Sequence, residues 1–217
     1  MKERKGFIFD LDGVLVDTAK YHYLAWKRLA EELGFSFTEE QNERLKGVSR
    51  MRSLDILLEI GNIKASESEK NEWAARKNEW YVEYISNMDA SHILPGATEF
   101  LVEAKELGKR LAIGSASKNA MIILKNTGLF PYFDAVIDGN KVTKAKPDPE
   151  VFLLAAEELE VDPTLCVVFE DSEAGIEAAK RAGMAAVGIG SKEHLSKADI
   201  VIPSLKGASC KELVKSL

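Results

Sequence analysis

Residues 7–17, Phe-Ile-Phe-Asp-Leu-Asp-Gly-Val-Leu-Val-Asp, decide the fold of this chain. The apolar positions 6–9 are typical of a buried parallel strand, and Asp10 and Asp12 follow where Gly13 interrupts the pattern. Open α/β sheets bind ligands outside the carboxyl ends of their strands, so both carboxylates are expected to face a site. Because two close carboxylates repel each other unless a cation holds them, the stretch predicts a Mg²⁺ site. Taken alone, it is equally compatible with a strand that ends in two solvated acids.

The composition is that of an ordinary globular protein. The chain has 217 residues, 46% hydrophobic and 29% charged, with a net charge of −6. This charge indicates neither nucleic acid nor an anionic membrane as a partner, and no apolar run has the length of a membrane span. The charged N-terminus lacks the apolar segment of a signal peptide. We therefore expect a cytoplasmic protein, a monomer, that binds no nucleic acid and no membrane. Cys166 lies in an apolar run, which favours a buried free thiol over a disulfide.

The order of predicted elements indicates two domains. Residues 18–94 are polar and helical, with helices expected around Trp26–Leu33, 50–60 and 66–86. Beyond residue 95, strands expected over 110–114, 135–137, 166–169, 185–189 and 199–202 alternate with helices over 119–127, 149–160 and 173–182. This alternation predicts an α/β fold with a parallel sheet covered on both faces. We expect a Rossmann-like core of residues 1–17 and 95–217, and an inserted all-helical cap domain of residues 18–94.

Three further strand ends carry residues suited to binding phosphate. Ser115 opens a turn of small residues before a helix, where backbone N–H groups favour an anion. Lys146 lies on a turn stiffened by two prolines within residues 144–149, where its ammonium can face a phosphate. Glu170 and Asp171 end another apolar strand. Each signal has an ordinary alternative: a helix cap for Ser115, a solvated side chain for Lys146, and acids favoured by a helix dipole for the acidic pair.

In their order along the chain, these four motifs resemble those of the haloacid dehalogenase superfamily, whose phosphotransferases begin with Asp-x-Asp-Gly and include Lys-Pro-Asp-Pro. The resemblance implies that Asp10 is a nucleophile that forms an aspartyl phosphate and that Asp12 is the general acid and base. It further implies that Ser115 binds the transferred phosphoryl group and that Lys146 neutralises it. The Mg²⁺ ligands it implies are Asp10, the backbone carbonyl of Asp12, Glu170 and Asp171.

A loop of the predicted cap narrows the resemblance. Residues 46–53, Lys-Gly-Val-Ser-Arg-Met-Arg-Ser, resemble the cap loop of the β-phosphoglucomutase family, and residues 17–22 and 75–78 match two other cap segments. The resemblance implies that Arg50 grips the phosphate that is not transferred, and that His22 and Lys77 link substrate contact to the acid/base Asp. Met51 and Arg52 depart from it, because acidic residues are expected there. The implied substrate-binding residues are Thr18, Lys46, Gly47, Val48, Arg50, Ser53, Ala116, Ser117, Lys118 and Asn119.

The resemblance implies an Mg²⁺-dependent mutase that interconverts β-D-glucose 1-phosphate and glucose 6-phosphate through a 1,6-bisphosphate. A sugar-phosphate or phosphoglycolate-type phosphatase is the alternative, because the core motifs are common to both reactions. A non-catalytic sugar-phosphate sensor is a third reading, against which the intact nucleophile and Lys146 argue. Read without their surroundings, His22 is equally a packed helix residue and Lys77 a solvated one. The aromatic residues Trp26, Trp73 and Trp80 are interpreted as cap core, and Arg52 as a surface residue.

Overall fold

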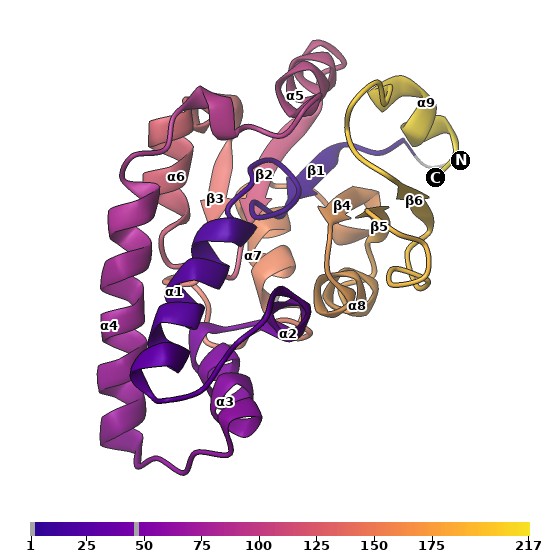
Figure 1. The fold of residues 1–217 in the computed structure, drawn as a ribbon. Coiled ribbons are helices and arrows are strands. Elements are labelled where there is room, and N and C mark those ends of the chain that lie inside the picture. Colours follow the sequence, from indigo (N-terminus) through magenta and orange to yellow (C-terminus); the bar gives the residue numbers. More distant parts are fainter. Residues whose placement is uncertain (1–2, 46–47) are drawn as a thin grey trace.

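The computed structural model describes residues 3–45 and 48–217, which contain a six-stranded parallel sheet in the order β3-β2-β1-β4-β5-β6 (Figure 1). Strand β1 is fully buried near the middle, where Phe7 lies in register with Leu111 of β2 and Val167 of β4. The predicted parallel sheet is therefore confirmed. The strands are β1 (Gly6–Phe9), β2 (Arg110–Gly114), β3 (Ala135–Ile137), β4 (Cys166–Glu170), β5 (Ala185–Ile189) and β6 (Ile200–Ile202).

Helices cover both faces of the sheet, because successive side chains of each strand point to opposite sides. Phe7 and Phe9 pack in one apolar cluster with residues of α5 (Ala97–Glu106), α6 (Ala120–Thr127) and α9 (Cys210–Lys215). Ile8 packs in a second cluster with residues of α7 (Glu150–Glu158) and α8 (Glu173–Arg181). The β1 motif is thus held from both sides, which fixes the direction in which the chain leaves the strand at Asp10.

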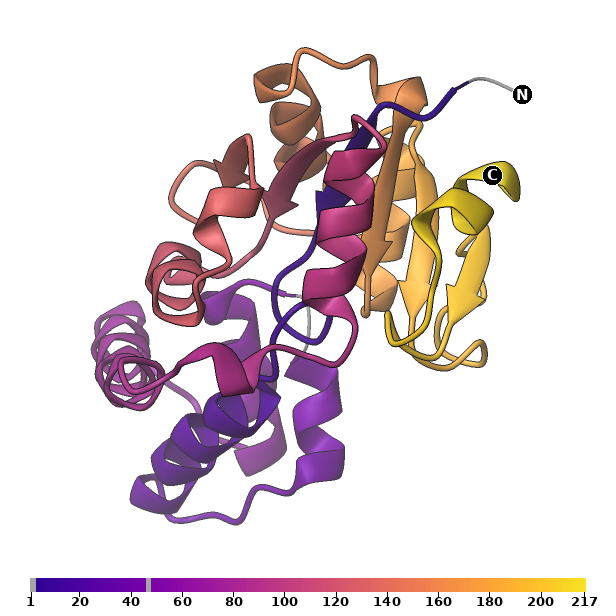
Figure 2. The same cartoon turned by 90° about the horizontal axis from the view of Figure 1, so that it is seen from above.

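Among the described residues, four α-helices between β1 and α5 form what we call the helical region: α1 (Ala19–Glu32), α2 (Glu39–Asn42), α3 (Arg50–Gly61) and α4 (Glu67–Ile85). Figure 2 shows them grouped together to one side of the sheet and its covering helices. Their ends follow local capping signals: the Ser49 hydroxyl accepts from the Arg52 N–H, and Ser66 forms a capping box with Glu69. The cap at Ser49 makes Arg50 the first residue of α3.

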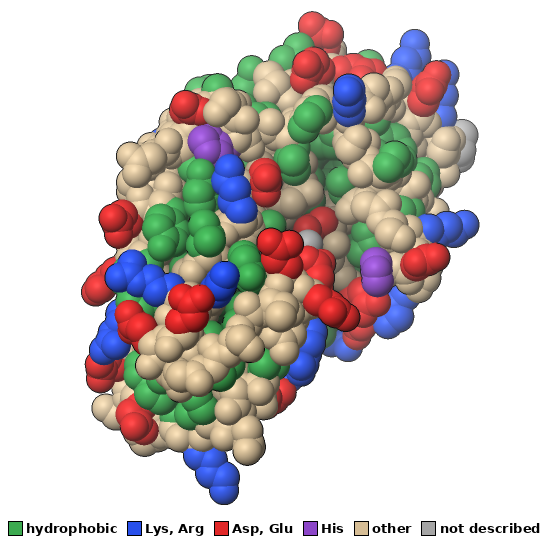
Figure 3. All heavy atoms as spheres, viewed as in Figure 1, with side chains coloured by type: hydrophobic (Ala, Val, Ile, Leu, Met, Phe, Trp, Pro, Cys, Tyr) green, Lys and Arg blue, Asp and Glu red, His purple; other side chains and the backbone are tan. Residues whose placement is uncertain are grey.

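Two chain segments that run side by side join the helical region to the sheet. The Asp17 N–H donates to the His92 carbonyl at 3.0 Å, and the Leu94 N–H donates to the Leu15 carbonyl at 2.9 Å. Val16 and Ile93 form an antiparallel bridge between these bonds. The two segments that connect the helical region to the sheet are therefore hydrogen-bonded to each other. On the face shown in Figure 3, acidic side chains gather around a hollow between the helical region and the sheet.

Most predicted elements agree with the structure to within two residues, and three helices were missed. Helix α7 covers Glu150–Glu158 rather than 149–160, and β6 begins at Ile200 rather than at residue 199. The missed helices are α2, α5 and α9. Cys166 and Cys210 are both buried free thiols, as predicted for Cys166. Within the described residues, no helix combines the length and the apolar character that a membrane crossing requires.

Candidate active site

The carboxyl ends of three neighbouring strands bring the sequence-predicted core residues together. Asp10 follows β1, Ser115 follows β2, and Glu170 is the last residue of β4. The Lys146 ammonium donates to Asp10 Oδ1 at 2.6 Å and to Glu170 Oε2 at 2.8 Å. Asp10, Ser115, Lys146 and Glu170 are all buried. A buried ammonium between two carboxylates fixes the positions of these three side chains relative to one another.

The acidic side chains around Lys146 carry more negative charge than its single ammonium can neutralise. Burial raises the pKa of Asp10 to about 7; Lys146 works against this rise, while Glu170 and Asp12 add to it. Burial works to lower the pKa of Lys146, but attraction to Asp10 and Glu170 outweighs it and leaves that pKa raised. Lys146 therefore stays protonated at neutral pH. One ammonium does not neutralise the acids, so a divalent cation would stabilise the ionised form of Asp10.

The residues present fit a magnesium ion. Asp10, Glu170 and Asp171 each offer a carboxylate oxygen within 4.8 Å of the others, and oxygen ligands are what Mg²⁺ prefers. Two glycines make room for these acids. A Cβ at Gly13 would lie 2.1 Å from Asp171 Oδ2, and a Cβ at Gly175 would lie 2.0 Å from Glu170 Cδ. The cluster includes three of the four predicted ligands, and the part of the Asp12 carbonyl stays a prediction.

The loop between β2 and α6 is organised by its own hydroxyls. The Ser117 N–H donates to Ser115 Oγ at 3.1 Å, and the Asn119 N–H donates to Ser117 Oγ at 3.2 Å. Behind the loop, a Cβ at Gly139 would lie 2.4 Å from the Ala116 carbonyl oxygen, so only glycine fits there. The loop thus presents two hydroxyls and the start of α6 to the same space, an arrangement that favours an anion.

Across from this loop, α1, α3 and α4 contribute three basic side chains. Lys77 Nζ lies 3.0 Å from His22 Nδ1 and above the rings of Trp26 and Tyr81, at 4.5 and 4.6 Å from their centroids. Burial lowers the pKa of His22, and Lys77 and Arg50 lower it further. Burial and Arg50 likewise lower the pKa of Lys77. Positive neighbours thus disfavour the charged forms of His22 and Lys77, and a bound anion would offset this effect.

Asp12 lies between the sheet and the helical region. Its carboxylate Oδ1 accepts a hydrogen bond from the hydroxyl of Thr18, which is fully buried. Burial raises the pKa of Asp12, and the hydrogen bond from Thr18 partly offsets that rise. Asp12 is therefore an acid whose proton affinity is tuned by its surroundings, at the position that the sequence predicts for the acid/base.

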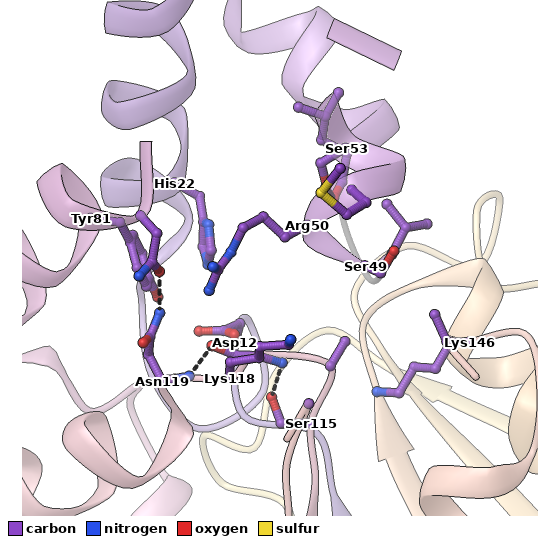
Figure 4. Close-up of a pocket in the computed structure, with 18 of the residues that line it drawn as sticks. Asp12, His22, Ser49, Arg50, Ser53, Tyr81, Ser115, Lys118, Asn119 and Lys146 are labelled. Atoms are coloured by element: carbon purple, nitrogen blue, oxygen red, sulfur yellow. Dashed lines mark hydrogen bonds between the residues drawn. The ribbon is translucent and has the colours of Figure 1, made fainter. Parts of the chain in front are cut away.

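One cavity of about 630 Å³ connects these groups, a size that suits a small ligand. Figure 4 shows His22 and Arg50 pointing from the helical region toward Asp12, while Lys146 extends into the view from the right.

The predicted residues Lys46 and Gly47 lie outside the described residues. The Ser53 hydroxyl is already engaged, since it donates to the Leu45 carbonyl at 3.4 Å. The predicted residues that line the cavity are Asp10, Asp12, Thr18, His22, Val48, Arg50, Ser53, Lys77, Ser115, Ala116, Ser117, Lys118, Asn119, Lys146 and Asp171.

The sequence reasoning missed Tyr81 and Asn78, which also line the cavity. Tyr81 lies one helical turn after Lys77, so the spacing from Lys77 was the signal that could have found it, and Asn78 lies three residues before Tyr81. Asn78 Oδ1 accepts from Asn119 Nδ2 at 2.8 Å, which links α4 to the loop before α6. Trp26, interpreted as core, is buried and also forms part of the cavity wall.

The two residues that depart from the cap-loop pattern differ in their surroundings. Met51 is half-buried and lines the cavity. Arg52 is exposed and pairs with Glu59 at 3.3 Å, in line with its interpretation as a surface residue. Only the change at position 51 therefore alters the cavity wall.

Comparison with known proteins agrees with this geometry. Residues 4–183 match the model of the haloacid dehalogenase-like hydrolases. A β-phosphoglucomutase of Bacillus subtilis is 44% identical, over 91% of this chain and 88% of its own length. A phosphorylated carbohydrates phosphatase of Thermotoga maritima is 39% identical, over 82% and 81%. The crystal structure of a β-phosphoglucomutase from Clostridium difficile superposes with a TM-score of 0.94 at 42% identity, covering 98% of this chain and 96% of the other.

Proposed function

Because the chain belongs to the haloacid dehalogenase-like hydrolase family, we propose that it is a β-phosphoglucomutase. It interconverts β-D-glucose 1-phosphate and glucose 6-phosphate through an aspartyl phosphate and β-glucose 1,6-bisphosphate. The observation that carries this proposal is that two regions of one cavity are lined by side chains suited to binding a phosphate. One region is at the carboxyl ends of the strands, around Asp10, and the other is formed with the helical region, around Arg50. A bisphosphate needs both.

At the first region, Asp10 attacks the phosphorus atom of the bound substrate, and the bond to the sugar oxygen breaks. Lys146, whose ammonium already lies 2.6 Å from Asp10, faces the negative charge of the phosphoryl group. The Ser115 hydroxyl and nearby N–H groups bind its oxygens. Asp10, Glu170 and Asp171 would hold a Mg²⁺ ion, which would supply further positive charge to offset that of the phosphoryl group.

At the second region, Arg50 binds the phosphate that stays in place. A guanidinium can form two parallel hydrogen bonds with one phosphate, which orients the sugar as well as holding it. Ser117, Lys118 and Asn119 lie on the facing loop and complete this region. In the other half of the cycle, the phosphoryl group of Asp10 passes to the free hydroxyl of β-glucose 1-phosphate, and the bisphosphate so formed turns end for end so that its other phosphate faces the freed Asp10.

Asp12 gives a proton to the departing sugar oxygen and removes one from the attacking hydroxyl. His22 and Lys77, on the adjacent helices, connect substrate contact to the position of Asp12. This arrangement ties proton transfer to the presence of a sugar, which is what a mutase needs in order to exclude water as an acceptor.

We further propose that residues 18–94 form a cap that closes over residues 1–17 and 95–217. Its hinges are the adjacent segments 17–18 and 94–96, which approach each other at the paired connections. Closure would bring Arg50 and Asp12 around the substrate and displace water. The expectation of a cytoplasmic monomer stays a prediction.

A phosphatase of sugar phosphates or phosphoglycolate is the second candidate, and the 39% identity to the phosphatase of Thermotoga maritima favours keeping it. The two candidates differ in what accepts the phosphoryl group from Asp10. A coupled assay with β-glucose 1-phosphate, Mg²⁺ and the bisphosphate as primer distinguishes them. The mutase forms glucose 6-phosphate with little free phosphate, whereas a phosphatase forms free phosphate and no glucose 6-phosphate.

A further inference from the structure

Asn42 is a buried amide on the wall of the cavity, and the proposed reaction gives it no role. The residue is 6% exposed and lines the cavity of about 630 Å³. It is the last residue of α2, whose start is fixed by a capping box between Thr38 and Gln41, and its N–H donates to the Thr38 carbonyl at 3.1 Å. The helix therefore holds the backbone of Asn42 in place without help from its side chain.

The side-chain amide of Asn42 is not satisfied within the protein. Its Oδ1 atom is buried and, among the described residues, has no hydrogen-bond partner. A buried acceptor without a partner lowers stability, and native proteins contain few of them. An amide carries two N–H donors and an acceptor oxygen, and its terminal torsion is soft. It can therefore turn toward a new partner without giving up a bond at Oδ1.

The chain beyond Asn42 lines the same cavity with apolar side chains. One is buried and two are partly buried: Leu45, Val48 and Met51. The nearby hydroxyls already have partners in the helical region. Ser49 Oγ accepts from the Arg52 N–H at 3.3 Å, and Ser53 Oγ donates to the Leu45 carbonyl at 3.4 Å. On this part of the wall, the Asn42 amide is thus the neutral polar group that still lacks a partner among the described residues.

An amide among apolar side chains suits a sugar. A pyranose ring carries C–H groups on its faces and hydroxyls around its edge, and each hydroxyl has a proton to donate. Ligand pockets commonly combine an apolar lining with a few polar groups that set orientation and specificity. Arg50 lines the same cavity and is assigned to a phosphate. The neutral amide of Asn42 is better suited to the uncharged part of the same ligand.

We propose that Asn42 is a specificity-determining residue whose amide hydrogen-bonds a ring hydroxyl of the bound sugar phosphate. This inference rests on the proposed sugar-phosphate substrate and extends it, because it assigns recognition of the sugar to α2. Leu45, Val48 and Met51 pack against the C–H groups of the ring. Oδ1 gains a partner when the sugar binds, so the site favours this sugar over one that lacks the hydroxyl.

A double-mutant cycle between protein and substrate tests this directly. Asn42→Ala removes the amide, and the 2-, 3- and 4-deoxy analogues of β-glucose 1-phosphate each remove one hydroxyl. We expect Asn42→Ala to lower kcat/KM for β-glucose 1-phosphate about 3- to 10-fold, the effect of one neutral hydrogen bond. For at least one analogue that loss should shrink to less than about twofold, because the hydroxyl is already gone. An equal loss for every substrate, or no loss for any, would overturn the proposal.

Stability separates recognition of the sugar from a structural role. Because Oδ1 has no partner to lose, Asn42→Ala should change the melting temperature of the ligand-free protein by less than about 4 °C, and a larger fall would overturn the proposal. Asn87→Ala is the matched control. It makes the same change at an exposed residue outside the described lining of the cavity, and should leave kcat/KM unchanged.

The assay counts product as sugar 6-phosphate plus inorganic phosphate, so that the two proposals fail in different ways. If the wild type releases only phosphate, the mutase proposal fails while the cycle still tests Asn42. If glucose 6-phosphate forms but the cycle shows no coupling, the mutase proposal stands and the role of Asn42 fails.

Discussion

The Lys146 ammonium bridges two buried carboxylates, 2.6 Å from Asp10 Oδ1 and 2.8 Å from Glu170 Oε2. Asp10 and Glu170 lie at the ends of adjacent strands, while Lys146 comes from a separate turn. The side chain of Lys146 is 1% exposed, so solvent does not screen these contacts. We therefore expect stability and the proposed phosphoryl transfer to depend on the same lysine.

Replacing Lys146 by alanine should damage both properties. It leaves Asp10 and Glu170 buried without their ammonium, and breaking a buried pair in this way costs about 3–5 kcal/mol. Urea unfolding without Mg²⁺ measures that loss, and a phosphoenzyme assay with Mg²⁺ should show a rate at least ~100-fold lower. Lys144→Ala is the matched control, because the Lys144 side chain is 70% exposed and its pair with Asp148 is 3.7 Å long. A similar effect of both substitutions would contradict the assignment.

The affinity for Mg²⁺ should fall as the pH is lowered through about 7. The pKa of Asp10 is raised to about 7, so the carboxyl is protonated below that pH and ionised above it. Mg²⁺ binds the ionised form, so a proton competes with the metal. We expect the apparent dissociation constant to rise about tenfold per pH unit below 7 and to level off above 7. Isothermal titration of Mg²⁺ between pH 5.5 and 8.5 (roughly one and a half units on either side) measures this, and a flat profile would be contrary to expectation.

Gly13→Ala should weaken metal binding through a steric effect on Asp171. A Cβ at Gly13 would lie 2.1 Å from Asp171 Oδ2, and φ there is +81°. Gly34 has a similar φ of +87° with nothing within 4 Å, so Gly34→Ala is a control for backbone strain alone. Both variants should lose about 1 kcal/mol of stability, because alanine disfavours positive φ. Only Gly13→Ala should also lose Mg²⁺ affinity, as measured by a metal-dependent shift in the melting temperature.

Arg50→Ala should impair turnover of a bisphosphate far more than hydrolysis of a small phosphate ester. The reason is that Arg50 is assigned to the phosphate that is not transferred, which a small ester lacks. We expect kcat/KM for the bisphosphate to fall about 100-fold, and that for p-nitrophenyl phosphate to fall less than about threefold. Arg52→Ala is the control. Arg52 lies two residues further along α3, and its exposed side chain pairs with Glu59. Equal losses on the two substrates would show that Arg50 holds no second phosphate.

The sequence was most predictive where chemistry and strand ends coincide. Asp10, Ser115 and Glu170 each follow or end an apolar strand, and the parallel register then brings them to one edge of the sheet. Lys146 and Arg50 could be predicted to line the same site because the sequence motifs that contain them are specific. The division into core and cap and the individual roles of these residues stay predictions.

Two of the three missed helices have local capping signals, a Thr38–Gln41 capping box before α2 and the Ser209 side chain that accepts from the Glu212 N–H before α9, but both helices are short. Helix α5 begins after Gly96, which has a positive φ and no side chain to cap the helix. The short α9 has its first N–H groups bound by Glu103, a contact over more than 100 residues. Tyr81 was missed because an aromatic residue on a helix is typical of core packing, and the His22 ring that stacks on it comes from another helix. Such placements depend on tertiary packing.

The fate of the phosphoryl group on Asp10 tests the central claim most directly. The enzyme is phosphorylated with radiolabelled acetyl phosphate, separated from the donor and mixed with β-glucose 1-phosphate and Mg²⁺, with Asp10→Asn as the unlabelled control. We expect the label to leave Asp10 for glucose 1,6-bisphosphate and then glucose 6-phosphate, faster than it is lost to buffer alone. Label recovered only as inorganic phosphate, at the same rate with and without the sugar, would contradict the account.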